Sequence, residues 1–184
     1  MAFAFNLTQG KRAERKTLIT IARWKDLGSE NPLATDAPGT GIHTEILGTR
    51  TEDSSIEFNA DIETTTDIRG ITYSDINKTE PQQDFDPYYI LGGSTLGEFM
   101  HRNALKNNIT AYSGTFNIYV VTMYDSDNTK YYTVKHEACS IIPTSIGGDS
   151  YVNMPLEVHF SNKITEGYIT SSTGTIDENF SFAS

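Results

Sequence analysis

The feature that most constrains the fold of this chain is a repeated period-two alternation of apolar and polar residues. Between residues 54 and 62 the even-numbered positions from Ile56 to Ile62 are apolar, and polar or charged residues stand between them. Residues 151–160 repeat the pattern, with Pro155 in the polar set. Successive side chains of a β-strand point to opposite faces, so each segment predicts a strand with one buried face. The proline places the second strand at a sheet edge or a bulge.

Further strands are predicted from composition and turn residues. Residues 115–124 and 129–140 are rich in Tyr, Val, Ile and Thr, and the polar run 125–128 separates them, so we expect a hairpin. Glycines punctuate shorter candidates at residues 18–24, 43–47, 68–73 and 164–170. A total of about eight strands predicts a mainly β fold, either a β-sandwich or a partly open barrel.

One flanking α-helix is predicted over residues 96–105, with Thr95 as its N-cap. Thr95 and Glu98 have the spacing of a capping box at a helix start. Leu96, Phe99, Met100 and Ala104 recur at the spacing of one helix face, so this face should pack against a sheet. The run 106–108 supplies a basic last turn and a stop.

The length of 184 residues fits a single domain over residues 1–184. We expect an N-terminal arm at residues 1–16, a long loop at residues 26–42 and a C-terminal arm at residues 171–184. Cys139 is the one cysteine, so no intramolecular disulfide can form. No basic region precedes the first apolar residues, and no apolar run has the length of a membrane span, so we expect a cytoplasmic start and no membrane partner.

Charge is distributed unevenly along the chain. The net charge is −10, yet residues 1–25 hold six basic residues against the single acidic residue Glu14. These six are Lys11, Arg12, Arg15, Lys16, Arg23 and Lys25. They form either a solvated basic arm or a contact with acidic surface on another copy of the chain. The acidic remainder is poorly suited to gripping nucleic acid, which proteins bind through Lys and Arg.

We find no residue pattern typical of catalysis, a metal or a cofactor. The four histidines, His43, His101, His136 and His159, are far apart and lack a metal-ligand spacing. Cys139 lies among apolar strand residues, where a thiol packs as a small hydrophobic group. We therefore predict that the chain is not an enzyme and that it takes no cofactor.

Three weaker patterns have simpler explanations. The glycine-rich residues 92–97 precede the helix but lack the Gly-Lys-Ser/Thr ending of a phosphate loop. Asp125, Asp127 and Asn128 lack the Gly and distal Glu of a calcium loop and suit a hairpin turn. The tyrosines could form a sugar-binding surface, but their placement in strands favours core and subunit-interface positions.

Residues 53–89 carry a resemblance to a known family. A strand is followed by Thr66-Asp67-Ile68-Arg69-Gly70, then by Thr79-Glu80-Pro81 and by Asp86-Pro87-Tyr88. In this order these motifs resemble the major tail tube protein of long-tailed, non-contractile bacteriophages. The helix, the strand pair after it and residues 143–149 before a last alternating strand extend the resemblance over about residues 53–170.

The resemblance implies a β-sandwich with a flanking helix and six copies per ring, with rings stacked into a tube in the virion tail. Its partners would be further copies of the chain and, as the resemblance implies, the tape measure, terminator and distal tail proteins. Genome DNA would pass through the tube without specific binding. Two other classes stay open, a carbohydrate-binding or adhesion β-sandwich and another virion part such as a tail terminator or a contractile-tail inner tube.

Two hypotheses name residues for this function. First, Glu57, Asp61, Glu63 and Asp67 line the lumen, where like charges repel DNA phosphates. Second, the six basic residues of the N-terminal segment contact acidic surface on a neighbouring subunit or ring. Unpaired strand edges would supply the assembly contact, because subunits in a ring can pair edge with edge.

Overall fold

The computed structural model describes residues 3–26, 39–49, 51, 54–171 and 173–184. Residues 27–38, which make up most of the loop predicted at residues 26–42, lie outside the described residues. The fold is mainly β, with one α-helix, a large antiparallel sheet and no closed barrel among the described residues, as the sequence predicts for a partly open β-sandwich.

Twelve strands are present in the described residues, more than the eight or so predicted. Short extra strands at both termini and beside the long ones account for the difference. The strands are β1 (Ala4–Phe5), β2 (Leu18–Lys25), β3 (Ile42–Ile46), β4 (Ile56–Glu57), β5 (Ala60–Thr66), β6 (Thr72–Thr79), β7 (Gln82–Phe85), β8 (Phe116–Asp127), β9 (Lys130–Pro143), β10 (Leu156–His159), β11 (Ile164–Thr170) and β12 (Phe182–Ala183). The helical elements are α1 (Thr95–Leu105) and the 3-10 turns η1 (Arg15–Thr17) and η2 (Ile109–Ala111).

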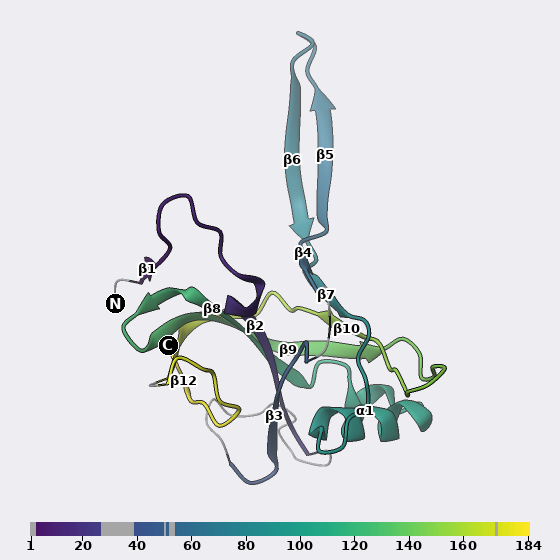
Figure 1. Cartoon of the computed structure of the whole chain (residues 1–184). Helices are drawn as coiled ribbons and strands as arrows, with labels where there is room; N and C mark the ends of the chain where they lie inside the picture. The colour runs from purple at the N-terminus through teal and green to yellow at the C-terminus, as the bar shows by residue number, and fades with distance from the viewer. Residues whose placement is uncertain (1–2, 27–38, 50, 52–53, 172) are drawn as a thin grey trace.

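The sheet is organised around β9, the longest strand. One edge of β9 pairs with β8, which confirms the predicted hairpin. The other edge pairs with β11 over its first half and with β10 over its last four residues. The sheet therefore divides into two wings (Figure 1). Strands β2 and β3 extend it beyond β8, and β7 and β4 extend it beyond β10.

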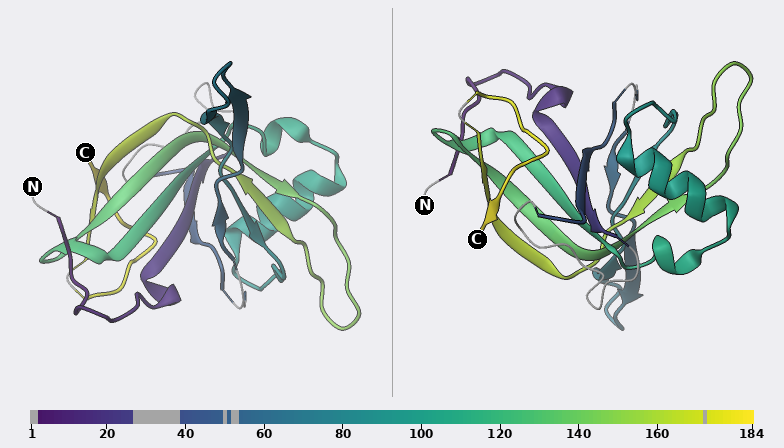
Figure 2. Two further views of the ribbon diagram at one scale, coloured as in Figure 1. Left: turned by 90° about the horizontal axis from the view of Figure 1, so that it is seen from above. Right: turned by 90° about the horizontal axis from the view of Figure 1, so that it is seen from below.

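The first core fills the space between α1 and the sheet. Leu96 and Met100 of α1 are fully buried and belong to one apolar cluster with Trp24, Phe85 and Phe116. The predicted helix face thus packs as expected. Seen from below, α1 lies against one side of the sheet, and the chain's C-terminal segment lies toward the other (Figure 2).

The C-terminal segment is not a free arm, which corrects the sequence prediction for residues 171–184. Ile176, Phe180 and Phe182 are buried in a second apolar cluster with Ile21 and Tyr119. The short strand β12 pairs with β11. This approach requires a glycine in β11, because a Cβ on Gly167 would lie 2.2 Å from the Ala183 carbonyl oxygen.

Arg23 fastens this segment from inside the protein. Its side chain is fully buried, and its guanidinium lies 3.9 Å from the centre of the Phe180 ring. Nη2 donates to the Phe180 carbonyl oxygen at 2.8 Å, and Nε donates to the Thr44 hydroxyl at 3.0 Å. A buried charge is tolerated only when it is paired and hydrogen-bonded, and these contacts supply that environment.

The alternating segment at residues 54–62 is not one strand, and its predicted buried face is wrong. Strand β4 ends before Asn59, which has a φ of +42°. Asparagine is one of the few non-glycine residues that adopt this left-handed conformation readily. The chain leaves the sheet at Asn59, so Phe58 and Ile62, predicted to be buried, are 65% and 58% exposed.

Two other strand predictions are wrong in extent. In residues 68–73 the chain forms a turn, and β6 begins only at Thr72. In residues 151–160 only β10 is a strand, and it lies between β9 and β7 rather than at an edge. Pro155 precedes β10, where its carbonyl oxygen accepts a bond from the Thr144 amide at 3.0 Å. The buried set of Met154, Leu156, Val158 and Phe160 agrees with the sequence pattern.

Helix α1 begins one residue earlier than the capping box predicts. The N-cap is Ser94, whose hydroxyl accepts a bond from the Gly97 amide at 2.9 Å. The Glu45 carboxylate of β3 accepts a bond from the Leu96 amide at 3.0 Å, so β3 caps the helix start from outside. A carboxylate at this position also interacts favourably with the helix dipole.

Replacing Arg23 with methionine is expected to lower the free energy of unfolding by about 2–4 kcal/mol, because the Phe180 carbonyl loses its buried donor. Denaturant unfolding measures this loss, and limited proteolysis should cut the C-terminal segment first. Arg102→Met is the matched control, because the Arg102 side chain is 69% exposed. Equal stability of the Arg23 variant and the control would contradict this role.

Candidate assembly surfaces

Strands β5 and β6 form a hairpin that stands away from the body of the protein, and we call it the ribbon (Figure 1). Every residue of both strands is exposed. Among the described residues the ribbon pairs with no other strand. Isolated two-stranded hairpins are marginally stable in water, so a ribbon of this length lacks the packing that normally supports a sheet.

The turn at the ribbon tip is built around Asp67. Its Oδ1 accepts bonds from the amides of Arg69 and Ile71 at 2.8 and 3.0 Å. These bonds hold the pKa of Asp67 below its ordinary value, and the bond from the Ile71 amide has the largest effect. Gly70 supplies the left-handed conformation of the turn, with a φ of +78°. Asp67, predicted to line a lumen, thus stabilises the turn.

The ribbon has one uncharged face. Directly opposite residues of an antiparallel pair share a face, so the register assigns each side chain to one side. Ile62 is opposite Ile76, and beyond them Thr64 is opposite Ser74 and Thr66 opposite Thr72. Ile62 and Ile76 are 58% and 66% exposed. This face is apolar toward the body and hydroxyl-rich toward the tip.

The other face is acidic. Asp61 is opposite Lys78, Glu63 is opposite Asp75, and Thr65 is opposite Tyr73. Like charges directly opposite each other destabilise a hairpin, so the Glu63–Asp75 pair weakens the ribbon further. Two of the four predicted lumen residues, Asp61 and Glu63, meet on this face. Glu57 lies apart, opposite Gln82 in the body.

Asp75 belongs to the acidic face but is absent from the sequence prediction. The predicted strand at residues 68–73 stops two residues before it, whereas β6 runs from Thr72 to Thr79 and places Asp75 opposite Glu63. The signal that could have found it is the run of β-branched and polar residues at 72–79, which follows the Asp67–Gly70 turn and mirrors residues 60–66.

The six basic residues of the N-terminal segment do not form one cluster. Lys11 and Arg12 are exposed on a loop that projects on the same side of the sheet as the ribbon (Figure 1). Arg15 donates to the carbonyl oxygens of Leu18 and Ser54 at 2.5 and 2.6 Å, and Lys16 pairs with Glu14 at 2.6 Å.

Arg23 corrects the sequence prediction most clearly. Because it is fully buried under the C-terminal segment, its side chain is not on the surface that a neighbouring subunit would contact. Lys25 is half-buried at the end of β2. Arg15 and Lys16 are also exposed but are engaged within the chain, so Lys11 and Arg12 are the stronger candidates for contact with another subunit.

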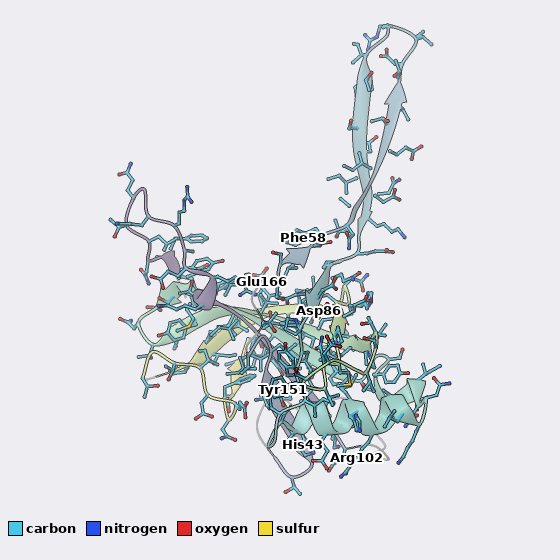
Figure 3. The ribbon with its side chains drawn as sticks, turned by 45° about the vertical axis from the view of Figure 1, so that its right-hand side comes forward. His43, Phe58, Asp86, Arg102, Tyr151 and Glu166 are labelled. Atoms are coloured by element: carbon cyan, nitrogen blue, oxygen red, sulfur yellow. The ribbon has the colours of Figure 1, made fainter. Side chains whose placement is uncertain are left out.

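A cavity of about 560 Å³ lies at the end of the body away from the ribbon. Strand β3, the residues before α1 and the C-terminal segment line it. His43, one of its lining residues, lies far below Phe58 at the ribbon root (Figure 3). We call it the β3 cavity.

Glu45 is the polar centre of the β3 cavity. Its Oε1 accepts bonds from the hydroxyls of Tyr88 and Ser94 at 2.6 and 2.9 Å. Burial, and then the Glu45 charge, raise the pKa of Tyr88. Burial, and then Glu45, likewise raise the pKa of Glu178, which also lines the cavity. The cavity therefore presents two carboxylates that repel each other.

The other residues weighed in the sequence analysis as possible ligand or catalytic groups have structural roles. Glu45 already occupies the start of α1, where the glycine-rich residues 92–97 would have met a phosphate. Burial lowers the pKa of His136, whose Nδ1 bonds the Ser161 carbonyl oxygen at 2.9 Å, and burial raises the pKa of Cys139. Asn128 occupies the β8–β9 turn with a φ of +56°.

The described part of the chain has neither a metal-binding cluster nor a membrane-spanning helix. There, no three His, Cys, Asp or Glu side chains gather in a way that could hold a metal ion. No helix in this part is long and apolar enough to cross a membrane. Comparison of the sequence with protein-family models and with curated proteins found no match.

Glu178→Gln is expected to raise the free energy of unfolding at pH 7. A carboxyl whose pKa is higher in the folded chain loses stability as the pH rises above its unfolded value, here 4.5. The gain should shrink as the pH falls through the raised pKa and vanish below about pH 4. It should stay under about 1 kcal/mol, since Glu178 is partly solvated.

Urea unfolding at several pH values measures this difference. Glu57→Gln, which removes an exposed carboxylate of β4 outside the lining of the β3 cavity, is the matched control. A gain for Glu178→Gln that was the same at pH 4 and pH 7 would contradict the assigned cause.

Proposed function

We propose that this chain is a structural virion protein that assembles with copies of itself into stacked rings forming the tail tube of a long-tailed phage. The observation that carries the proposal is the exposed ribbon, with one uncharged and one acidic face. The resemblance of residues 53–170 to tail tube proteins implies that the rings are hexameric. It also implies tape measure, terminator and distal tail proteins as partners. Genome DNA would pass through this tube into the host.

The ribbon needs a partner for physical reasons. All residues of its two strands are exposed and no second layer covers them in the described part of the chain, and its opposed Glu63 and Asp75 repel each other. Covering Ile62 and Ile76 would remove apolar surface from water, worth about 25 cal/mol per Å². Its outer strand edges also carry backbone donors and acceptors that another strand can pair. Another copy of the chain is the partner that a closed ring always supplies.

The acidic face suits a tube that conducts DNA. Asp61, Glu63 and Asp75 outnumber Lys78 there, so a ring of such faces would repel phosphates. DNA would then slide without the counterion release that makes basic surfaces bind it.

The position of the basic loop at Lys11 and Arg12 bears on whether the N-terminal segment contacts a neighbour in the same ring or in the next ring. The loop and the ribbon project on the same side of the sheet (Figure 1), so they meet between neighbours in one ring more easily than between stacked rings. This contact would weaken as salt screens it.

Ile76→Asp is expected to raise the protein concentration needed for assembly by about tenfold or more, because a buried isoleucine is worth about 1.5–3 kcal/mol. Negative-stain microscopy and sedimentation of the concentrated protein measure tubes or rings. Ile109→Asp is the matched control, since Ile109 is 60% exposed and lies in η2, off the ribbon.

Hollow tubes for the parent chain and the control, with monomers for Ile76→Asp, are the expected result. A parent chain that stayed monomeric at every concentration and bound glycans saturably would instead favour the carbohydrate-binding alternative and refute the proposal.

Virions carrying Asp61→Lys together with Glu63→Lys are expected to eject DNA more slowly, and most slowly at low salt, because the new cations bind phosphates. Single-particle ejection assays measure the rate. Asp149→Lys, in an exposed loop of the body, is the control and should eject normally. An unchanged rate for the double variant would remove these residues from the lumen.

A further inference from the structure

The β3 cavity is lined by two negatively charged side chains. Glu45 and Glu178 both line it and raise each other's electrostatic energy. Among the described residues that line the cavity, His43 is the one basic side chain, and it pairs with Asp26 at 2.7 Å. A cation placed between the two carboxylates would relieve their repulsion.

The ribbon tip presents the complementary group. Ile68 is fully exposed at the turn, and the guanidinium of Arg69 is 71% exposed beside Asp67. The bonds to Asp67 hold the turn in one conformation, so docking it orders little additional backbone. Arginine is also suited to two carboxylates, because its planar guanidinium carries five donors.

The tip and the cavity lie at opposite ends of the molecule. The ribbon extends from one end, and β3 and α1 form the other (Figures 1 and 3). A group and its complement at opposite poles cannot meet within one chain. They meet when a second copy stacks head to tail, which is the geometry that produces an open-ended assembly.

We infer that the ribbon tip of one copy seats in the β3 cavity of the next, with Arg69 between Glu45 and Glu178 and Ile68 against the cavity wall. This inference rests on the proposed self-assembly and names the partner surfaces for stacking along the tube. The mutual contact adds the C-terminal segment to the interface, since Glu178 and Asn179 line the cavity. Stacking therefore depends on that segment being folded in place.

The test is a charge exchange measured as the critical concentration for tube formation. Arg69→Glu alone and Glu178→Arg alone are each expected to raise it at least about tenfold, because each leaves like charges facing each other. The double variant, in which the two charges are exchanged, is expected to restore assembly to within about threefold of the parent. The control pairs Arg69→Glu with Glu98→Arg, on α1 outside the cavity lining, and should not restore it.

Glu178→Gln keeps the test decisive if Glu178→Arg fails to fold. It preserves the side-chain shape, so it should fold and still raise the critical concentration. Normal assembly of Arg69→Glu or of Glu178→Gln would overturn the inference and leave the proposed function intact. Failure of the exchanged pair to assemble while folded would also overturn it. A parent chain that forms no tubes would instead refute the proposed function.

A covalent trap gives an independent measurement. Ile68→Cys combined with Asn179→Cys should give ladders of linked chains in oxidised tubes, since the native Cys139 is buried and does not compete. Linked chains are expected only from assembled material. Tubes of this double variant that yield no ladder would place the tip elsewhere and overturn the inference.

Discussion

Backbone pairing along β9 is the interaction on which the rest of the structure depends. Its fourteen residues use one edge for β8 and divide the other between β11 and β10. Ala138 has a φ of +57° near an irregularity in the β8–β9 register, just before the strand's second half pairs with β10. Bulges of this kind bend a strand and increase its twist. The bend lets a single strand serve two wings.

Two polar anchors, the half-buried Glu45 and the fully buried Arg23, keep these wings and their covering segments in place. Glu45 joins β3 to the start of α1, and Arg23 joins β2 to the C-terminal segment. Both residues lie on neighbouring strands, because β2 pairs with β3. The helix on one side and the C-terminal segment on the other are thus fixed to the same pair of strands. A substitution of either anchor would therefore alter the shape of the β3 cavity, which both covering segments line.

Local patterns predicted those elements whose partners are near in sequence. The β8–β9 hairpin follows from two β-rich runs around a polar turn, and α1 follows from its apolar spacing and stop signal. The start of α1 was misplaced because Ser94 and Thr95 are both good caps, and the choice is decided by Glu45, which is far away in sequence. The mainly β class needed only the sum of such local signals.

The ribbon and the C-terminal segment could not be predicted, because alternation says that one face differs from the other but not what covers it. Ile56 packs against the first core, whereas Ile62 is exposed on the ribbon, although both belong to one alternating run. The left-handed Asn59 between them decides the difference. In the same way, the sequence groups Arg23 with the other basic residues, but the residue that covers its side chain, Phe180, is 157 positions away in the sequence.

The contrast between a well-packed body and an unsupported ribbon has a consequence for assembly. Local stability differs across a protein, and segments with few buried contacts open at low free-energy cost. A ribbon with a like-charged pair and no covering layer belongs to that class, while its Asp67 turn stays fixed by hydrogen bonds. A free subunit would therefore lose ribbon conformational entropy when the ribbon docks, and this loss opposes association until several contacts form together. Growth at an existing end, where ribbon and neighbour meet in several contacts at once, is favoured over spontaneous pairing of two free chains.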